Sequence, residues 1–188
     1  MPEGRIIFLN GASSSGKSSI AKALQAFIEE PCIHFCIDDY LGAFQSSLCA
    51  REDAVRRRWP DILRGFHAAG AAMARAGNWV IIDDVLEAEP PWVESLLELF
   101  ENLDVVFVGV HCPLEELERR ERERPERREG MARLQFTQVH AQAIYDLEVD
   151  TLAMSPQECA ERIASHLKDE PRSRAFMQLR EQHHDHDT

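Results

Sequence analysis

The chain has 188 residues, which is enough for one α/β domain with a single hydrophobic core and too few for two. Its formal net charge of -12 disfavours a nucleic-acid partner, because an acidic surface attracts polyanions poorly. No stretch approaches the roughly 20 apolar residues that a membrane helix needs, and the five cysteines fit no disulfide pattern. We therefore expect reduced thiols in a cytoplasmic protein without membrane contacts.

Apolar runs typical of strands alternate with segments of helical periodicity along the chain. The first strand is expected over residues 6–9, a short and fully apolar run. Further strands are expected over 33–37, 79–82, 105–110 and 147–149, and helices over 18–29, 53–76, 92–100 and 114–124, with Pro60 breaking or kinking the second helix. This alternation predicts a three-layer α/β fold, with a five-stranded parallel sheet and helices on both faces.

The last expected helix has a start signal of its own. Ser155 is the expected N-cap, Pro156 occupies the first helical position and Glu158 completes a capping box, with apolar residues recurring as far as Leu167. We therefore assign residues 1–168 to one domain. Beyond it the chain becomes polar and ends in a histidine-rich run, so we expect residues 169–188 to form a mobile tail with room for one helical turn.

The segment after the first expected strand matches the phosphate-binding pattern G-x-x-x-x-G-K-[ST] over residues 11–18. Gly11 and Gly16 let successive backbone N–H groups converge on phosphate oxygens. Lys17 reaches the β- and γ-phosphates, and Ser18 offers its hydroxyl to Mg²⁺. The expected ligands are ATP and Mg²⁺, and the expected nucleotide-binding residues are Gly11, Ala12, Ser13, Ser14, Ser15, Gly16, Lys17, Ser18 and Ser19.

Two pairs of aspartates follow expected strands, at the sheet edge where ligands gather in such folds. Asp83 and Asp84 end the strand over 79–82, which is the usual magnesium-supporting element beside a phosphate loop. Side chains alternate along a strand, so one of the two is expected to face the metal, and both stay candidates beside Ser18. The alternative for either aspartate is a turn or helix cap.

Asp38 and Asp39 end the second expected strand, whose tip lies across the cleft from the γ-phosphate in this architecture. A hydroxyl acceptor needs a carboxylate there to orient it and take its proton, although a cap or turn is again the alternative. Cys32, His34 and Cys36 share one face of the same strand. That spacing fits a metal site, but packing in the core is the commoner use of such residues.

Arginines crowd one short segment, which we assign to a lid over about 118–133. Pro125 and Gly130 interrupt it and let it bend, so that it can deliver positive charge to a phosphate site. The alternative is a solvated helix surface with ion pairs, because glutamates are interleaved throughout. The arginines are Arg119, Arg120, Arg122, Arg124, Arg127, Arg128 and Arg133.

Taken together, these motifs resemble the chloramphenicol phosphotransferase family from residue 6 to about residue 167. The matching segments are Ser13-Ser14-Ser15-Gly16-Lys17-Ser18, Ile81-Ile82-Asp83-Asp84-Val85, Val108-Gly109-Val110-His111-Cys112, Arg120-Glu121, Arg124-x-x-Arg127-x-x-Gly130-Met131, Val139-His140 and Tyr145-Asp146-Leu147-Glu148-Val149-Asp150-Thr151.

The resemblance implies a nucleotide-kinase-like fold and ATP-dependent phosphorylation of an alcohol group. It implies Asp38 as the catalytic base and places Arg124 and Arg127 in the lid near the phosphates, with Lys17 as the further catalytic residue. The family's namesake phosphorylates a primary hydroxyl of an antibiotic, so antibiotic modification is one expected role. The stretch after Asp38, which begins Asp39-Tyr40-Leu41, differs from the namesake in the region of the acceptor pocket.

Other functions share the same phosphate loop. One is a kinase for a housekeeping metabolite such as a sugar acid or nucleoside, and another is a polynucleotide 5′-hydroxyl kinase, which the acidic charge disfavours. A third is a nucleotide-binding switch that hydrolyses slowly and has no acceptor. The function we expect is phosphoryl transfer from ATP to a small hydroxylated molecule.

Overall fold

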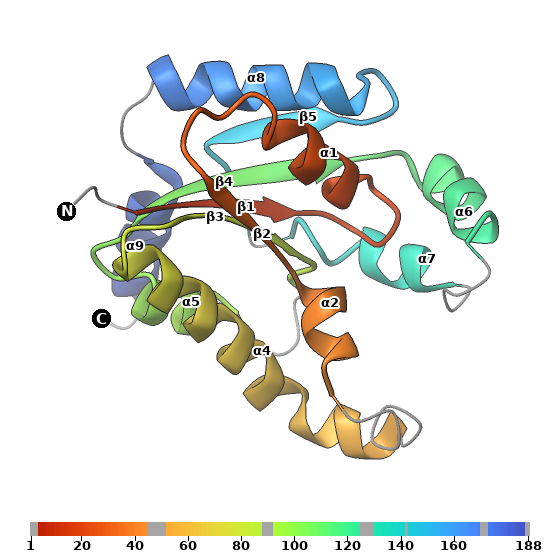
Figure 1. Ribbon diagram of the computed structural model, residues 1–188. Coiled ribbons are helices and arrows are strands. Elements are labelled where there is room, and N and C mark those ends of the chain that lie inside the picture. The colour runs from red at the N-terminus through yellow and green to blue at the C-terminus, as the bar shows by residue number, and fades with distance from the viewer. Residues whose placement is uncertain are drawn as a thin grey trace.

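Five parallel strands form the centre of the computed structural model, which describes residues 4–44, 52–87, 92–124, 130–141, 143–169 and 173–186. The strands follow one another across the sheet in the order β2-β3-β1-β4-β5 (Figure 1). Their bounds are Arg5–Asn10 for β1, Cys32–Cys36 for β2, Trp79–Asp84 for β3, Asp104–His111 for β4 and Leu147–Asp150 for β5. The five-stranded parallel sheet predicted from the sequence is confirmed.

Helices cover both faces of the sheet, as Figure 1 shows. The helices α1 and α8 lie on one face, and α4, α5 and α9 lie on the other. Among the described residues, the helix bounds are Lys17–Leu24 for α1, Ile37–Gly42 for α2, Glu52–Arg75 for α4, Val93–Leu99 for α5, Leu114–Arg122 for α6, Met131–Phe136 for α7, Pro156–Asp169 for α8 and Ala175–His186 for α9. None of these helices combines the length and apolar character of a membrane span.

The central strand β1 is buried along its whole length because it pairs on both sides and is covered on both faces. Its alternate side chains separate the hydrophobic core into two halves. Ile6 and Phe8 join the cluster under α4, α5 and α9, whereas Ile7 and Leu9 join the cluster under α1 and α8. The predicted layers are therefore confirmed, and every strand that enters the sheet ends at the same edge.

One local expectation is narrowed and another needs correction. Pro60 does not break the helix over residues 52–75, because the chain is exposed there and water can replace the hydrogen bond that proline does not donate. The second strand ends at Cys36, and Ile37 begins α2, so Asp38 and Asp39 lie in the first turn of a helix. A carboxylate is favourable in that position because the amino end of a helix carries partial positive charge.

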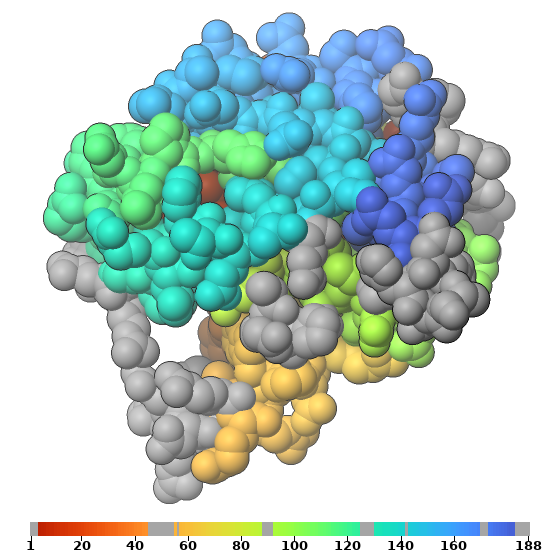
Figure 2. All heavy atoms as spheres, turned by 180° about the vertical axis from the view of Figure 1, so that it is seen from behind, coloured from red at the N-terminus to blue at the C-terminus, as the bar shows by residue number. Residues whose placement is uncertain are grey.

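The chain after residue 169 forms more than the polar tail with room for one helical turn that we expected. Residues Ala175–His186 form α9, and Ala175, Phe176 and Leu179 are buried against α5 and β4. Figure 2 shows this helix lying against the body of the molecule. The start of α9 is fixed by Asp146, whose carboxylate accepts hydrogen bonds from Ser173 Oγ and from the backbone N–H groups of Arg174 and Ala175.

Candidate active site

The phosphate loop joins β1 to α1, and its backbone adopts positive φ angles. Gly16 has φ 99° at the amino end of α1, and Ser14 has φ 65°. A side chain at Gly11 would place its Cβ 2.4 Å from the carbonyl oxygen of Val110, so only glycine fits there. Lys17 curls over the loop, and its Nζ lies 2.9 Å from the Gly11 carbonyl oxygen and 3.1 Å from that of Ala12.

Asp83 faces this loop from the end of β3. Ser18 Oγ donates to its Oδ2 at 2.6 Å, and Lys17 Nζ lies 3.9 Å from its Oδ1. His34 Nε2 lies 3.3 Å from Oδ2. Burial would raise the pKa of the Asp83 carboxyl, but His34, Lys17 and Ser18 together hold that pKa below its ordinary value. The carboxylate is therefore ionised at neutral pH.

Asp84 points to the opposite face of β3, as alternation requires. Its Oδ2 lies 2.8 Å from Nε2 of the buried His67 on α4, and its Oδ1 accepts the backbone N–H of Val85 at 2.7 Å. The structure thus brings Asp83 to Ser18 and places Asp84 away from the phosphate loop.

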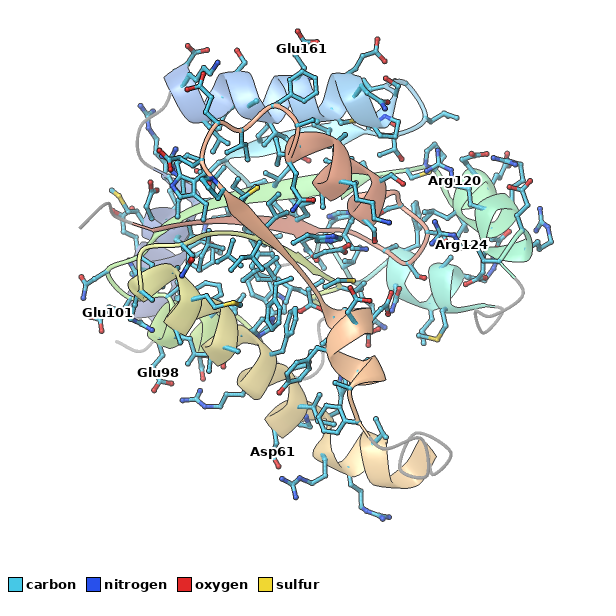
Figure 3. The ribbon with its side chains drawn as sticks, viewed as in Figure 1. Asp61, Glu98, Glu101, Arg120, Arg124 and Glu161 are labelled. Atoms are coloured by element: carbon cyan, nitrogen blue, oxygen red, sulfur yellow. The ribbon has the colours of Figure 1, made fainter. Side chains whose placement is uncertain are left out.

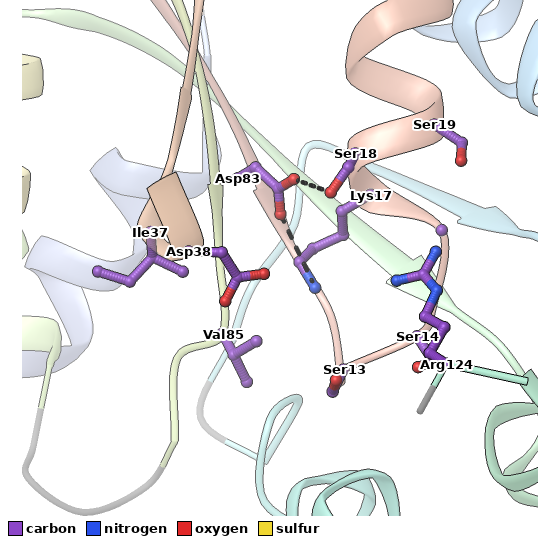
Figure 4. Close-up of a pocket in the computed structure, with 11 residues that line it drawn as sticks. Ser13, Ser14, Lys17, Ser18, Ser19, Ile37, Asp38, Asp83, Val85 and Arg124 are labelled. Atoms are coloured by element: carbon purple, nitrogen blue, oxygen red, sulfur yellow. Dashed lines mark hydrogen bonds and ion pairs between the residues drawn. The ribbon is translucent and has the colours of Figure 1, made fainter. Parts of the chain in front are cut away.

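Asp38 and Arg124 line the same pocket as the phosphate loop (Figure 4). Asp38 projects from the first turn of α2, and Figure 4 shows its carboxylate on the side of the pocket opposite Arg124, with Lys17 between them. Asp39 is exposed and does not line this pocket. The second expected lid arginine, Arg127, lies outside the described residues. The remaining lining residues are Ser13, Ser14, Gly16, Lys17, Ser18, Ser19, Ile37, Asp83 and Val85.

The side chains of Arg120 and Thr151 support the phosphate loop, and the sequence did not predict this role for either of them. Arg120 donates to Thr151 through Nη1 at 3.0 Å and Nη2 at 2.9 Å, and Thr151 Oγ1 donates to the Ser15 carbonyl oxygen at 2.8 Å. Arg120 lies near Arg124 on one side of the molecule (Figure 3). Thr151 directly follows β5, at the edge of the sheet where ligands bind. This position in the sequence could have indicated that Thr151 supports the phosphate loop.

The α7 helix, which the sequence reasoning missed, also contacts the loop. Gln135 Oε1 accepts the backbone N–H of Ser13 at 2.8 Å, and Gln135 Nε2 donates to Glu87 Oε1 at 2.8 Å. The amino end of α7 is fixed by the buried Glu121, whose carboxylate accepts the N–H groups of Gly130 and Ala132. The α7 helix, which follows the expected lid arginines Arg124 and Arg127, is thereby joined to both α6 and the phosphate loop.

The residues present fit a nucleotide with Mg²⁺. Within the described chain, Ser14 Oγ and Ser15 Oγ are buried without a hydrogen-bond partner, and phosphate oxygens can accept from both. The Ser18 hydroxyl and the ionised Asp83 offer the hard oxygen atoms that Mg²⁺ prefers. The pocket therefore brings together the phosphate loop, Lys17, the Ser18–Asp83 pair and the Asp38 carboxylate.

Comparison with solved structures places the fold among the P-loop kinases. The APS kinase of Mycobacterium tuberculosis in complex with AMPPNP and APS matches with a TM-score of 0.67 at 17% identity, covering 89% of this chain and 99% of that one. A sugar kinase from Janibacter sp. HTCC2649 matches with a TM-score of 0.65 at 20% identity, covering 90% and 97%. The chain therefore has the fold of the P-loop kinases.

Sequence comparison then gives the family. Residues 4–168 match the chloramphenicol phosphotransferase-like protein family, so the chain belongs to it and the predicted resemblance is confirmed. A relative from two strains of Mycobacterium tuberculosis, named "Putative O-phosphotransferase", is 34% identical over 203 residues, covering 96% of this chain and 89% of that protein.

Proposed function

We propose that this protein transfers the γ-phosphate of ATP to a hydroxyl group of a small molecule. One observation carries the proposal: Lys17, Asp83 and Asp38, which project from three different segments, all line one pocket. The first two serve the phosphates and their metal, and the third serves an acceptor. The free thiols of the described cysteines fit a reducing, cytoplasmic setting for this activity.

In the proposed reaction, the acceptor oxygen attacks the γ-phosphorus in line with the bond to the leaving ADP. Asp38 orients the acceptor hydroxyl and takes its proton as the new O–P bond forms. Lys17 and Arg124, together with Arg127, stabilise the negative charge on the transferring phosphoryl group. Ser18 and Asp83 would hold Mg²⁺, which would supply positive charge to the phosphates.

The acceptor we propose is a small, largely apolar molecule with a free hydroxyl, such as an antibiotic. On α2, which carries Asp38, and on α4, the side chains of Tyr40, Leu41 and Trp59 are only partly buried against the core. The Tyr40 ring lies against Phe35 and Phe66. Partly exposed aromatic and aliphatic surface beside a carboxylate suits an apolar alcohol. The sequence's net charge of -12 disfavours an oligonucleotide acceptor.

The test is an acceptor screen that measures ADP release. Chloramphenicol and other neutral hydroxylated antibiotics are compared with sugar acids, nucleosides and a 5′-hydroxyl oligonucleotide. We expect the highest kcat/KM with a neutral hydroxylated compound and none with its deoxy analogue. Slow ADP release that no acceptor stimulates would contradict a kinase and support a nucleotide switch.

The matched variants Asp38→Asn and Asp39→Asn test the assignment of the base. We expect Asp38→Asn to lower kcat by about 100-fold or more with little change in nucleotide affinity, because the amide keeps the shape but cannot take a proton. Asp39→Asn should have a mild effect, since Asp39 does not line the pocket. The reverse order of effects would make Asp39 the base.

A further inference from the structure

A second set of metal-ligating atoms lies beside the magnesium-supporting pair. His34 and Cys36 lie two residues apart on the same face of β2, and Cys36 is opposite Asp83 in the parallel register with β3. The register therefore brings the imidazole, the thiol and the carboxylate together. One ligand atom from each of the three side chains lies within 4.8 Å of the other two.

These side chains are enclosed but lie next to the nucleotide pocket. Cys36 is 6% exposed and Asp83 is 3% exposed. His34 lies 3.3 Å from the carboxylate that lines the pocket. The three-ligand set therefore adjoins the pocket through Asp83.

The chemistry of the set differs from that of the Ser18–Asp83 pair. Mg²⁺ takes oxygen ligands, whereas imidazole nitrogen, thiolate sulfur and one carboxylate oxygen form a three-ligand set typical of zinc, with a fourth position left for water or phosphate. Phosphoryl transfer does not require a thiol at this place. Asp83 is the one residue that both sets share.

We propose that His34, Cys36 and Asp83 form a zinc site, and that zinc bound there displaces Ser18 from Asp83. Binding converts the Cys36 thiol to the thiolate and releases its proton to solvent. The occupied site withholds Asp83 from Mg²⁺, so zinc inhibits the enzyme. The binding half of this proposal stands on the geometry alone, and the inhibitory half rests on the proposed function.

Cobalt(II) provides a direct test of binding on the full-length protein without nucleotide. A thiolate-bound tetrahedral Co²⁺ gives a sulfur-to-metal charge-transfer band in the near ultraviolet together with visible d–d bands, and zinc should displace it at one equivalent. Histidines of the chain terminus cannot give the charge-transfer band, so binding there is distinguished. Absence of the band in the wild-type protein overturns the proposal.

Two cysteines on the same face of one strand supply matched variants. Cys36→Ser should abolish the charge-transfer band and weaken zinc binding by about 100-fold or more, since even outer-shell changes cost roughly 10–100-fold. Cys32→Ser should keep both, because Cys32 packs against the apolar cluster and is not among the converging ligands. His34→Gln, which leaves the thiol in place, provides a second test if Cys36→Ser does not fold. Equal zinc affinity in Cys32→Ser and Cys36→Ser overturns the assignment.

Inhibition is measured separately, as acceptor-dependent ADP release at increasing zinc and fixed Mg²⁺. We expect the inhibitory zinc concentration to rise in Cys36→Ser in step with its weaker binding, and inhibition to weaken as Mg²⁺ is raised. A charge-transfer band without inhibition overturns the competition for Asp83. A protein that binds cobalt but shows no transfer activity would instead count against the proposed function.

Discussion

Asp83 and Asp84 are adjacent in sequence but face different surroundings, and this difference can be tested. Asp83→Asn should lower kcat by about 100-fold and raise the Mg²⁺ concentration needed for half-maximal rate, because it removes the charge beside Ser18. Asp84→Asn should leave the Mg²⁺ dependence unchanged. It should instead lower the free energy of unfolding by about 1–3 kcal/mol, because an amide in place of the carboxyl group disturbs the buried hydrogen bond to His67.

Titration of Mg²⁺ against ADP release, together with thermal unfolding of both variants, distinguishes the two roles. A changed Mg²⁺ requirement in Asp84→Asn with a normal one in Asp83→Asn would show that the metal is held from the other face of β3.

His140 should make the stability of the protein depend on pH. Burial, together with the nearby His111 and Lys17, lowers the pKa of His140 to about 4 from an ordinary value of 6.5. Its ring stacks on His111 with centroids 4.1 Å apart, and its Nδ1 lies 2.6 Å from the Tyr145 hydroxyl. The unfolded chain binds the proton more readily, so this stabilisation is complete above the unfolded pKa and is lost as the pH falls from about 6.5 towards 4.

The measurement is the melting temperature between pH 7 and pH 5. We expect His140→Gln to lose less stability than the wild type over this interval. An unchanged pH slope in His140→Gln would show that another group causes the acid sensitivity.

At the scale of single elements, the segment from α6 to α7 should become more protected when nucleotide binds. Arg124 of this segment lines the pocket. The start of α7 is held by Glu121, and Gln135 joins α7 to the phosphate loop. A non-hydrolysable ATP analogue at about 100 times its Kd stabilises the bound state by roughly 2.7 kcal/mol, so amide exchange in this segment should slow by up to about 100-fold.

Hydrogen exchange with and without the analogue and Mg²⁺ gives the answer, with α9 as the reference because it lies outside the pocket. Equal exchange of residues 119–133 in both states would make the segment a charged surface helix and not a lid.

The sequence predicted those elements whose local pattern also decides their structure. The strands β1, β3 and β4 contain continuous apolar runs. The capping box of α8 is confirmed, since Ser155 and Glu158 exchange hydrogen bonds in both directions. The phosphate loop carried its own pattern. By contrast, α2 and α7 have six residues each, too few for a helical period to stand out against the flanking loops.

Positions across the sheet could not be predicted in the same way. Alternation required that Asp83 and Asp84 face opposite sides, but only the register of β3 with its neighbours shows which one meets Ser18. The contact between Gln135 and Ser13 joins residues 122 positions apart, and no local pattern indicates it. The polar α9 was misjudged because Ala175, Phe176 and Leu179, the buried residues among its described side chains, give a weak apolar stripe.

For the whole molecule, the contribution of α9 to stability is open to direct measurement. Phe176 is 5% exposed and packs with ring centroids 5.8 Å from Phe100 and 5.6 Å from Phe107. We expect Phe176→Ala to lower the free energy of unfolding by about 3 kcal/mol, since the cavity lies in the main core. Met177→Ala, a neighbour on α9 that is 56% exposed, should change it by less than about 0.5 kcal/mol.

Urea unfolding of the two variants and the wild type gives these values. Equal stability of Phe176→Ala and Met177→Ala would mean that the domain ends before α9, at residue 168 as the sequence first indicated.

The clamp at Asp146 has a consequence for how the protein is made. Its carboxylate accepts from the backbone of Phe107 in β4 and from the residues that start α9, so it joins a central strand to a helix far along the chain. Everything that α9 covers is synthesised before α9 itself. The part of this face that α9 covers, beside α5 and β4, therefore stays open while the chain is still on the ribosome, and it needs protection from aggregation until this helix emerges and docks.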